Sequence, residues 1–255
     1  MIRKLILPLL SFAFIFPVII SHGQANVRDS VINAPIAYAS YGFHGLGGDI
    51  SKMYGPSSTI GGGMGYKSKK NIYFGLEYSY LFGAKVKGGD EIMADILTGD
   101  GQIIGQGGEY AIFQYYQRGH ILWAQAGKLF PVMARNPNSG LLVKFGLGFI
   151  QHRMDVSVQD NTALQLSGDY KFGYDRLTRG VGLNQFIGYL FIGDSRIWNF
   201  YAGLDFSQAW TKNVRDINFD TRKKDDSQHL DLFFGFKIGW VIPVYRQAPA
   251  DYYYN

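Results

Sequence analysis

The chain offers few side chains that could do acid, base or nucleophilic chemistry. Catalysis by an activated hydroxyl needs a base beside the nucleophile, so histidine is the residue to look for first. His152 is the best placed, because Asp155 and Ser157 follow it near the expected outer end of a strand. Successive strand residues alternate between faces, so His152 and Ser157 point to opposite sides. We therefore interpret His152 as a surface or interface histidine and predict no catalytic residue.

Other site chemistries have no support in the spacing of residues. The chain has no cysteine, which excludes a disulfide framework, and it shows no metal-ligand spacing or phosphate-binding loop. The glycine-rich stretch Gly45–Gly48 is short and no helical pattern follows it. The sequence predicts a non-enzymatic protein without cofactor or metal.

The most informative charged residue is Lys237, because it interrupts an apolar segment near the end of the chain, "LDLFFGFKIGWVIPVYR". Read with period two, this segment has one wholly apolar face, formed by Leu230, Leu232, Phe234, Phe236, Ile238, Trp240, Ile242 and Val244. Small, polar or charged residues, including Lys237, occupy most of the opposite face. A strand with this polarity suits a barrel whose outer face meets lipid.

The same polarity returns in other segments, which must position any interior side chain. Clear alternation covers Asn71–Gly83, Leu141–Phe149 and Trp198–Trp210, in addition to Leu230–Arg246. Weaker alternation, diluted by glycine, covers Ala37–Gly45, Thr59–Tyr66, His120–Val132 and Val181–Ile192. These segments predict eight strands.

The connections between these strands alternate in length. Short turns are expected at 67–71, 134–140 and 193–196, and long loops at 46–58, 86–119, 155–180 and 212–229. This asymmetry is typical of outer-membrane barrels. We therefore predict an all-β fold, an eight-stranded antiparallel up-and-down transmembrane β-barrel with short periplasmic turns and longer extracellular loops.

The N-terminus predicts export. Arg3 and Lys4 precede an apolar run from Leu5 to Ile20, and small, polar residues follow, as in a secretory signal peptide. We expect a signal peptide at 1–25, a periplasmic segment at 26–34, the barrel at 35–246 and a tyrosine-rich periplasmic tail at 247–255. The expected location is the bacterial outer membrane, as an integral protein.

Charged residues on the predicted inner faces form the first candidate site. Glu77, Lys144, Asp205 and Lys237 lie at overlapping heights, so their side chains can pair inside the barrel. Small closed barrels are filled by side chains, so we interpret this luminal charge network as interior packing. An ion path or a proton-linked gate is the alternative. Neighbouring glycines are expected to leave room for Tyr73 and Tyr201.

Two further candidate sites lie outside the barrel. The loop at 168–180 carries aromatic and charged residues expected to dock a partner, namely Tyr170, Phe172, Tyr174, Asp175 and Arg176. The loop at 89–110 mixes apolar and acidic residues and is expected to act as a lid or a docking surface. In the tail, Tyr252, Tyr253 and Tyr254 are expected to contact a periplasmic protein or to lie at the membrane interface.

Basic clusters suggest contact with lipid. Lys67, Lys69 and Lys70 fall in a predicted periplasmic turn, and Arg222, Lys223 and Lys224 fall in the last outer loop. The inner cluster suits phospholipid headgroups and the outer cluster suits lipopolysaccharide phosphates, although either can be a solvated turn. Nucleic acid is not an expected partner of an exported barrel.

Several longer motifs carry a family resemblance. The stretches "NPNSGLLVKFGLGFIQH", "QLSGDYKFGYDRLTRG", "FSQAWTK" and "GFKIGWVIPVYRQAP" resemble small Bacteroidota outer-membrane β-barrel proteins without an assigned function. The resemblance implies an accessory or interaction subunit of a larger outer-membrane barrel or export machine, in contact with surface or periplasmic proteins. The alternatives are an independent surface barrel, such as an adhesin or lipid-organising module, and a lipid-modifying enzyme.

Overall fold

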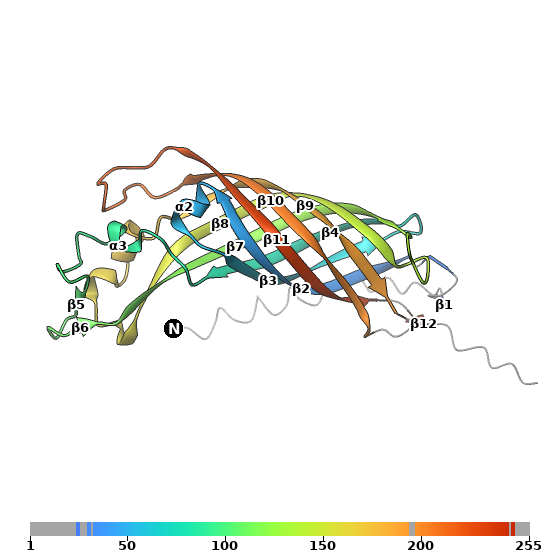
Figure 1. Cartoon of the computed structure of the whole chain (residues 1–255), viewed down its shortest axis with the longest axis horizontal. Coiled ribbons are helices and arrows are strands. Elements are labelled where there is room, and N and C mark those ends of the chain that lie inside the picture. Colours follow the sequence, from blue (N-terminus) through green and yellow to red (C-terminus); the bar gives the residue numbers. More distant parts are fainter. Residues whose placement is uncertain (1–23, 26–29, 32, 194–196, 245, 248–255) are drawn as a thin grey trace, which may run out of the picture.

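The protein is a closed barrel of eight strands (Figure 1). The computed structural model describes residues 24–25, 30–31, 33–193, 197–244 and 246–247. The barrel strands are β2 (Ala34–Gly48), β3 (Ser57–Lys67), β4 (Ile72–Gly83), β7 (Phe113–Phe130), β8 (Gly140–Val158), β9 (Thr178–Ile192), β10 (Asn199–Asn213) and β11 (Gln228–Pro243). Each pairs antiparallel with the barrel strand that follows it in the chain, and β11 closes the sheet onto β2. The predicted all-β, eight-stranded, up-and-down barrel is confirmed.

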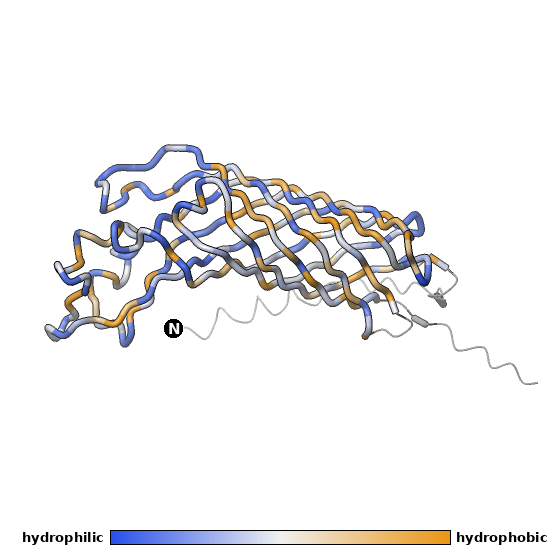
Figure 2. Tube along the Cα trace, viewed as in Figure 1, coloured by the Kyte–Doolittle hydropathy of each residue, from blue (hydrophilic) through white to orange (hydrophobic). Residues whose placement is uncertain are grey.

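The barrel wall is apolar on the outside along most of its height. On β11, Phe236 is 67% exposed, whereas the next residue, Lys237, is 3% exposed. The same alternation runs along the other barrel strands, and Figure 2 shows it as changes of colour along each strand. A strand that exposes its apolar side chains and buries its polar ones has the polarity of a lipid-facing barrel.

The two ends of the barrel differ. At one end, which we call the short-turn end, few residues separate Lys67 from Ile72, Phe130 from Gly140 and Ile192 from Asn199. Longer segments at 49–56, 84–112, 159–177 and 214–227 connect strands at the other end, the long-loop end. The long-loop end lies at the left in Figure 1.

Strands β7 and β8 extend further at the long-loop end than the sequence indicates. The strand expected from His120 begins at Phe113, and the strand expected to end at Phe149 continues to Val158. Above Phe149 the outward positions of β8 are polar, beginning with Gln151 and Arg153. Outside a lipid layer the outer face of a strand meets water, so the apolar alternation that reveals a strand disappears there.

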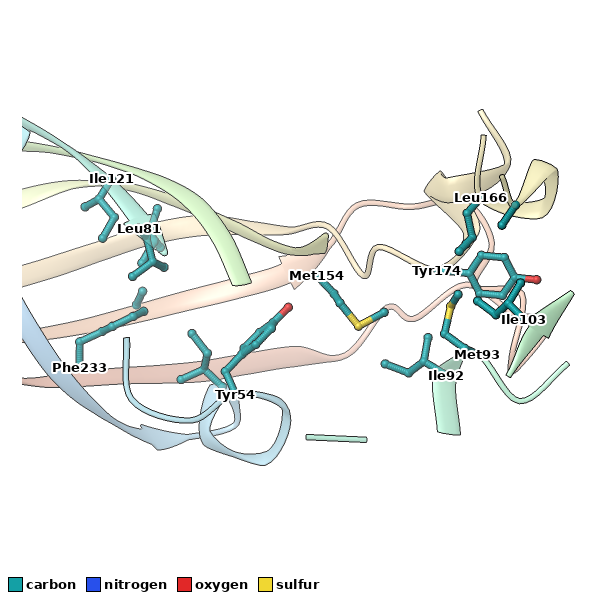
Figure 3. Packing of buried hydrophobic residues seen from close by; sticks show 14 of the residues in the cluster. Tyr54, Leu81, Ile92, Met93, Ile103, Ile121, Met154, Leu166, Tyr174 and Phe233 are labelled. Atoms are coloured by element: carbon teal, nitrogen blue, oxygen red, sulfur yellow. The ribbon is translucent and has the colours of Figure 1, made fainter. Parts of the chain in front are cut away.

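The long loops fold into an ordered layer over this end, which we call the cap (residues 84–112, 159–177 and 214–227). It contains α3 (Gly89–Ile92), β5 (Ile103–Ile104), β6 (Tyr110–Ala111) and the 3-10 turns η2 (Gln159–Asn161), η3 (Leu164–Leu166) and η4 (Tyr170–Gly173). The short helix α2 (Ile50–Met53) lies between β2 and β3. The buried apolar side chains of the cap continue into the upper barrel as one cluster (Figure 3).

Near the two ends of the chain, the described residues include one pair of short strands outside the barrel. β1 (Gln24–Ala25) pairs in parallel with β12 (Arg246–Gln247). The expected signal peptide lies almost entirely outside the described residues. Among the described residues, no helix is long and apolar enough to cross a membrane.

Candidate functional site

The structure brings the four predicted interior charges into one network. The Lys237 ammonium lies 2.8 Å from a Glu77 carboxylate oxygen and 3.0 Å from an Asp205 carboxylate oxygen. The Lys144 ammonium lies 3.5 Å from the second oxygen of Glu77. All four residues are buried, and their formal charges cancel. Pairing of this kind makes charges tolerable inside a protein, where an isolated charge would be costly.

Strand register explains how these long side chains fit. Each of the four charged residues has a glycine directly opposite it on a neighbouring strand. The pairs are Glu77 with Gly63, Lys144 with Gly127, Asp205 with Gly235, and Lys237 with both Gly203 and Gly42. A glycine presents no side chain to the lumen, so the charged side chain across from it can lean sideways toward its partner.

Glycines also make room for interior aromatic rings, as predicted. A Cβ atom added at Gly239 would lie 2.1 Å from the Tyr201 ring, and Tyr201 is the cross-strand partner of Gly239. A Cβ atom added at Gly75 would lie 2.1 Å from the Tyr73 hydroxyl. The expectation that glycines accommodate Tyr73 and Tyr201 is confirmed.

Uncharged polar residues extend the network beyond the four charges. The Tyr38 hydroxyl donates to Glu77 at 2.8 Å, and Lys144 donates to the Gln125 side-chain oxygen at 3.1 Å. The Asn184 amide donates to Asp205 at 3.0 Å, and His44 Nε2 lies 3.0 Å from the same carboxylate. These residues occupy inward positions on the predicted strands, so strand parity was the signal that could have found them.

Aromatic rings also lie close to the Lys144 ammonium. Its Nζ lies 4.9 to 5.3 Å from the ring centres of Tyr38, Phe186 and Tyr201. Cation–π contacts of this length favour a buried cation. Lys144 lies farther from Glu77 than Lys237 does, and these aromatic contacts offset its weaker ion pair.

The network lies between apolar clusters that fill both ends of the lumen. At the short-turn end the cluster includes Ile36, Leu129, Leu142, Leu190, Ile192 and Val241. At the long-loop end Leu81, Ile121 and Phe233 pack inside the barrel, to the left of Tyr54 and Met154 in Figure 3. Apart from a cavity of about 40 Å³ beside Tyr73 and one of about 10 Å³ beside Lys237, the described interior is packed with side chains, as expected for a barrel of eight strands.

The interpretation of His152 as a surface or interface residue is wrong. β8 continues past Phe149, so His152 points inward and is buried. Its Nε2 lies 3.0 Å from an Asp231 oxygen, which also accepts a 2.7 Å hydrogen bond from the Thr211 hydroxyl. The Tyr54 ring meets the imidazole edge to face, at 5.8 Å between ring centres.

This histidine and carboxylate do not form a nucleophile-activating set. Thr211 donates to Asp231 and makes no hydrogen bond to His152, while Ser157 is exposed on the opposite face of β8. Activation of a hydroxyl requires that the base itself accept the hydroxyl proton. Within the described residues, no group of three or more histidine, aspartate or glutamate side chains could hold a metal ion.

The prediction that Lys67 lies in a basic turn with Lys69 and Lys70 is also wrong. Lys67 is the last residue of β3, and its inward parity buries it at the short-turn end. Its ammonium donates to the Asn138 side-chain oxygen at 3.1 Å, which links β3 to the β7–β8 turn. Lys69 and Lys70 remain exposed in the turn.

The predicted docking loop is only partly available to a partner. Tyr170 is exposed, but Tyr174 and Asp175 are buried within the cap. Asp175 forms a bidentate ion pair with Arg215, whose guanidinium stacks on Phe172 at 4.3 Å. Arg176 pairs with Asp220. The idea that all five residues form one docking surface is therefore corrected, since most of them join two loops of the cap to each other.

Burial affects the ionisation of two tyrosines at the long-loop end. Burial, followed by the charge of Asp175, raises the pKa of the Tyr54 phenol, and burial, followed by the charge of Asp95, raises the pKa of Tyr174. Both phenols therefore stay protonated at neutral pH and act as packing groups. The predicted tail contacts Tyr252, Tyr253 and Tyr254 lie outside the described residues.

The fold and its interior define the class of the molecule, a small closed β-barrel with a filled lumen and a folded cap. Among solved structures, Neisserial surface protein A (NspA) is similar at 11% identity over 81% of this chain and 95% of that chain, with a TM-score of 0.37. The N-terminal β-barrel domain of Pseudomonas aeruginosa OprF is similar at 10% identity over 83% and 100%, with a TM-score of 0.37. Ail, the attachment invasion locus protein of Yersinia pestis, is similar at 11% identity over 82% and 98%, with a TM-score of 0.36.

No protein-family model matches the chain, and no curated protein matches it either.

Proposed function

We propose that this chain is a non-enzymatic integral barrel of a bacterial outer membrane that serves as an accessory subunit of a larger outer-membrane assembly or export machine. Its membrane location is supported by the exposed apolar wall and by aromatic residues toward both ends of that wall. Tyr66 and Trp240 are exposed toward the short-turn end, and Trp210 is exposed toward the long-loop end. Aromatic girdles of this kind flank the apolar band of outer-membrane barrels.

The observation that carries the proposal is the filled lumen. The buried pairs of Lys237 with Glu77 and Asp205, between two apolar clusters, occupy the space that a conducting pore would need. Because the lumen is filled, the outer wall and the cap are the surfaces through which such a barrel can function. Both are surfaces suited to binding other molecules.

The order of the cap supports an interaction role. Long loops without internal packing would be mobile connectors, but this cap has its own buried residues, such as Met93, Ile103 and Leu166. Ion pairs join its segments, as Arg215 does with Asp175. Ordered long loops on a rigid barrel are typical of functional surfaces.

Basic side chains near the barrel ends support contact with charged lipid groups. Lys69 and Lys70 are exposed at the short-turn end, and Arg222, Lys223 and Lys224 are exposed in the cap. Lipopolysaccharide phosphates are the expected partners of the second cluster, although Asp226 pairs with Lys224 at 3.2 Å and reduces its net charge.

A second candidate, an independent surface barrel that binds outside the membrane, is favoured by exposed apolar side chains on the cap. Tyr110, Ile112 and Tyr170 are each more than half exposed, although the cap lies beyond the apolar wall. Apolar side chains that are exposed outside the apolar wall are available to bind another molecule.

Purification of the tagged protein from native outer membranes in mild detergent tests the proposal. Recovery of a large barrel protein in near-equal amount supports the accessory role. Recovery of the protein alone contradicts it and favours the independent surface barrel. Reconstitution into a planar lipid bilayer is the second test, and we expect no stable ion conductance from the wild-type barrel.

A further inference from the structure

The outer wall carries a shallow groove centred on β7. Ala124 and Ala126 form its floor, because both are outward residues with very small side chains. In the strand register Ala124 lies between Leu76 of β4 and Leu147 of β8. Larger outward side chains thus rise on both sides of the alanines, and the wall is hollowed over β7.

One end of this groove is polar, although it lies in the apolar band. Gln185 of β9 lines the groove and is the cross-strand partner of Phe145. It points outward and lies midway between Arg179 and Phe191, the outward residues near the two ends of β9. Its side-chain amide makes no hydrogen bond to any residue that the structure describes.

An unpaired amide in the middle of a lipid-facing wall is unfavourable. Lipid tails offer neither hydrogen-bond donors nor acceptors, so the Gln185 amide would lose the partners that water gives it. Membrane-spanning segments that pack against one another combine small residues, which allow close approach, with polar side chains that bond across the interface. Ala124, Ala126 and Gln185 supply this combination at one place on the wall.

We propose that this groove is the lateral docking site for a membrane-spanning segment of a different integral protein. The segment would present an apolar ridge to Ala124 and Ala126 and a hydrogen-bonding side chain to Gln185. This inference rests on the proposed accessory function and specifies which part of the wall makes the contact.

Two other occupants fit the groove less well. A lipid acyl chain can fill the hollow over Ala124 but leaves the Gln185 amide unpaired. A second copy of this chain could pair two Gln185 amides, but two hollows facing each other would leave a gap over the alanines. A convex partner with a polar group satisfies both features.

Paired substitutions, one at the groove and one outside it, test the assignment. Ala124→Leu fills the groove, and Ala39→Leu makes the same change on β2, which lies opposite β8 in the strand order. Gln185→Leu removes the amide, and Gln151→Leu does so at an outward position of β8 that lies above Phe149 and does not line the groove. Each variant is purified from native membranes in mild detergent, after the heat-dependent gel shift has shown that it is folded.

We expect the groove variants to retain less of the co-purifying barrel than the wild type does, and the control variants to retain as much. Gln185→Leu should weaken retention of the co-purifying barrel by about threefold to thirtyfold, the value of one hydrogen bond between membrane segments. Ala124→Leu should reduce retention further, because it blocks the close approach. Wild-type retention in both groove variants would overturn the assignment and leave the accessory function standing.

Site-specific photo-crosslinking identifies the occupant directly and does not depend on variants that weaken binding. The probe p-benzoylphenylalanine replaces Phe145 at the groove or, as a matched control, Phe236 on β11, which lies opposite β7. The docking site predicts a protein adduct from position 145, of the same mass as the co-purifying barrel, and lipid adducts from position 236.

Other crosslinking results would count against the docking site. Lipid adducts from both positions, with a partner still co-purifying, would show that the contact lies elsewhere. Lipid adducts from both positions without any co-purifying partner would overturn the accessory function together with the docking site. A self-adduct from position 145 would show that the occupant is a second copy of this chain.

Discussion

The Lys237 ammonium lies 2.8 Å from the Glu77 carboxylate, although 160 residues separate them in the chain. β11 and β4 are not neighbours, since β2 and β3 lie between them in the sheet. The ion pair therefore spans the lumen instead of joining adjacent strands. It forms only when the sheet has closed, so it connects walls that the hydrogen bonds of the sheet connect only indirectly.

Removal of Lys237 should destabilise the barrel. In Lys237→Met the Glu77 and Asp205 carboxylates lose their shared cation inside the lumen, where water cannot replace it. Breaking a buried ion pair from one side typically costs about 3–5 kcal/mol. We expect a lower temperature for loss of the folded band on a gel, with refolding yield as a second measure.

Lys212→Met is the matched control, because Lys212 is exposed at the outward side of β10. It should leave the transition temperature unchanged. If the transition temperature of Lys237→Met were also unchanged, a buried methionine would stabilise the barrel as well as the lysine does. A more stable variant would indicate that the network is costly and is retained for another purpose.

Addition of one methyl group at Gly239 should also destabilise the barrel. In Gly239→Ala the new Cβ atom would lie 2.1 Å from the Tyr201 ring, which packs against Phe186 and Tyr38. Overpacking of this kind typically costs about 1–3 kcal/mol. Thermal unfolding in detergent measures the effect. Gly99→Ala in the cap, where nothing lies within 4 Å of the added atom, should be neutral.

Loss of the Asp175 charge should loosen the cap without affecting the barrel. Asp175→Asn weakens the bidentate pair with Arg215, and charge-assisted hydrogen bonds are worth about 1.5–3 kcal/mol. We expect amide hydrogen exchange within 170–177 to rise roughly tenfold or more, while the transition temperature of the barrel stays the same. Asp169→Asn, at an exposed position in the same loop, serves as the control. Unchanged exchange in Asp175→Asn would show that apolar packing alone orders the cap.

Strand parity allowed much of this interior to be predicted from sequence. Side chains alternate strictly along a strand, so the apolar outer face of Leu230–Arg246 placed Lys237 inside without any knowledge of its partner. The same reasoning placed Glu77, Lys144 and Asp205. It could not supply distances across the lumen, because these depend on which strands face each other in the closed barrel.

Strand parity could not be read from the sequence where a strand extends beyond the lipid layer. His152 lies above Phe149 on β8, where outward residues such as Gln151 face water and the alternation gives no signal. Lys67 was assigned to a turn because a lysine beside two others resembles a solvated cluster, although its position continues the inward series of β3. The cap was beyond prediction from periodicity, since short irregular segments pack through contacts distant in sequence.

A pH-dependent contact is expected where β11 begins at the long-loop end. The Asp49 carboxylate accepts hydrogen bonds from the Lys52 ammonium at 2.7 Å and from the Leu230 backbone amide at 2.9 Å. The Lys52 bond, followed by the Leu230 bond, holds the pKa of Asp49 below its ordinary value of 3.8. A carboxyl group with a lowered pKa in the folded state stabilises that state above its unfolded pKa.

This stabilisation should be lost as the pH falls below 3.8 and through the lower pKa of folded Asp49. We expect exchange of the Leu230 amide hydrogen, after correction for its intrinsic pH dependence, to accelerate over that interval. Asp49→Asn should remove this acceleration, because asparagine does not titrate there. The same acceleration in the variant would assign the effect to another acidic group near the start of β11.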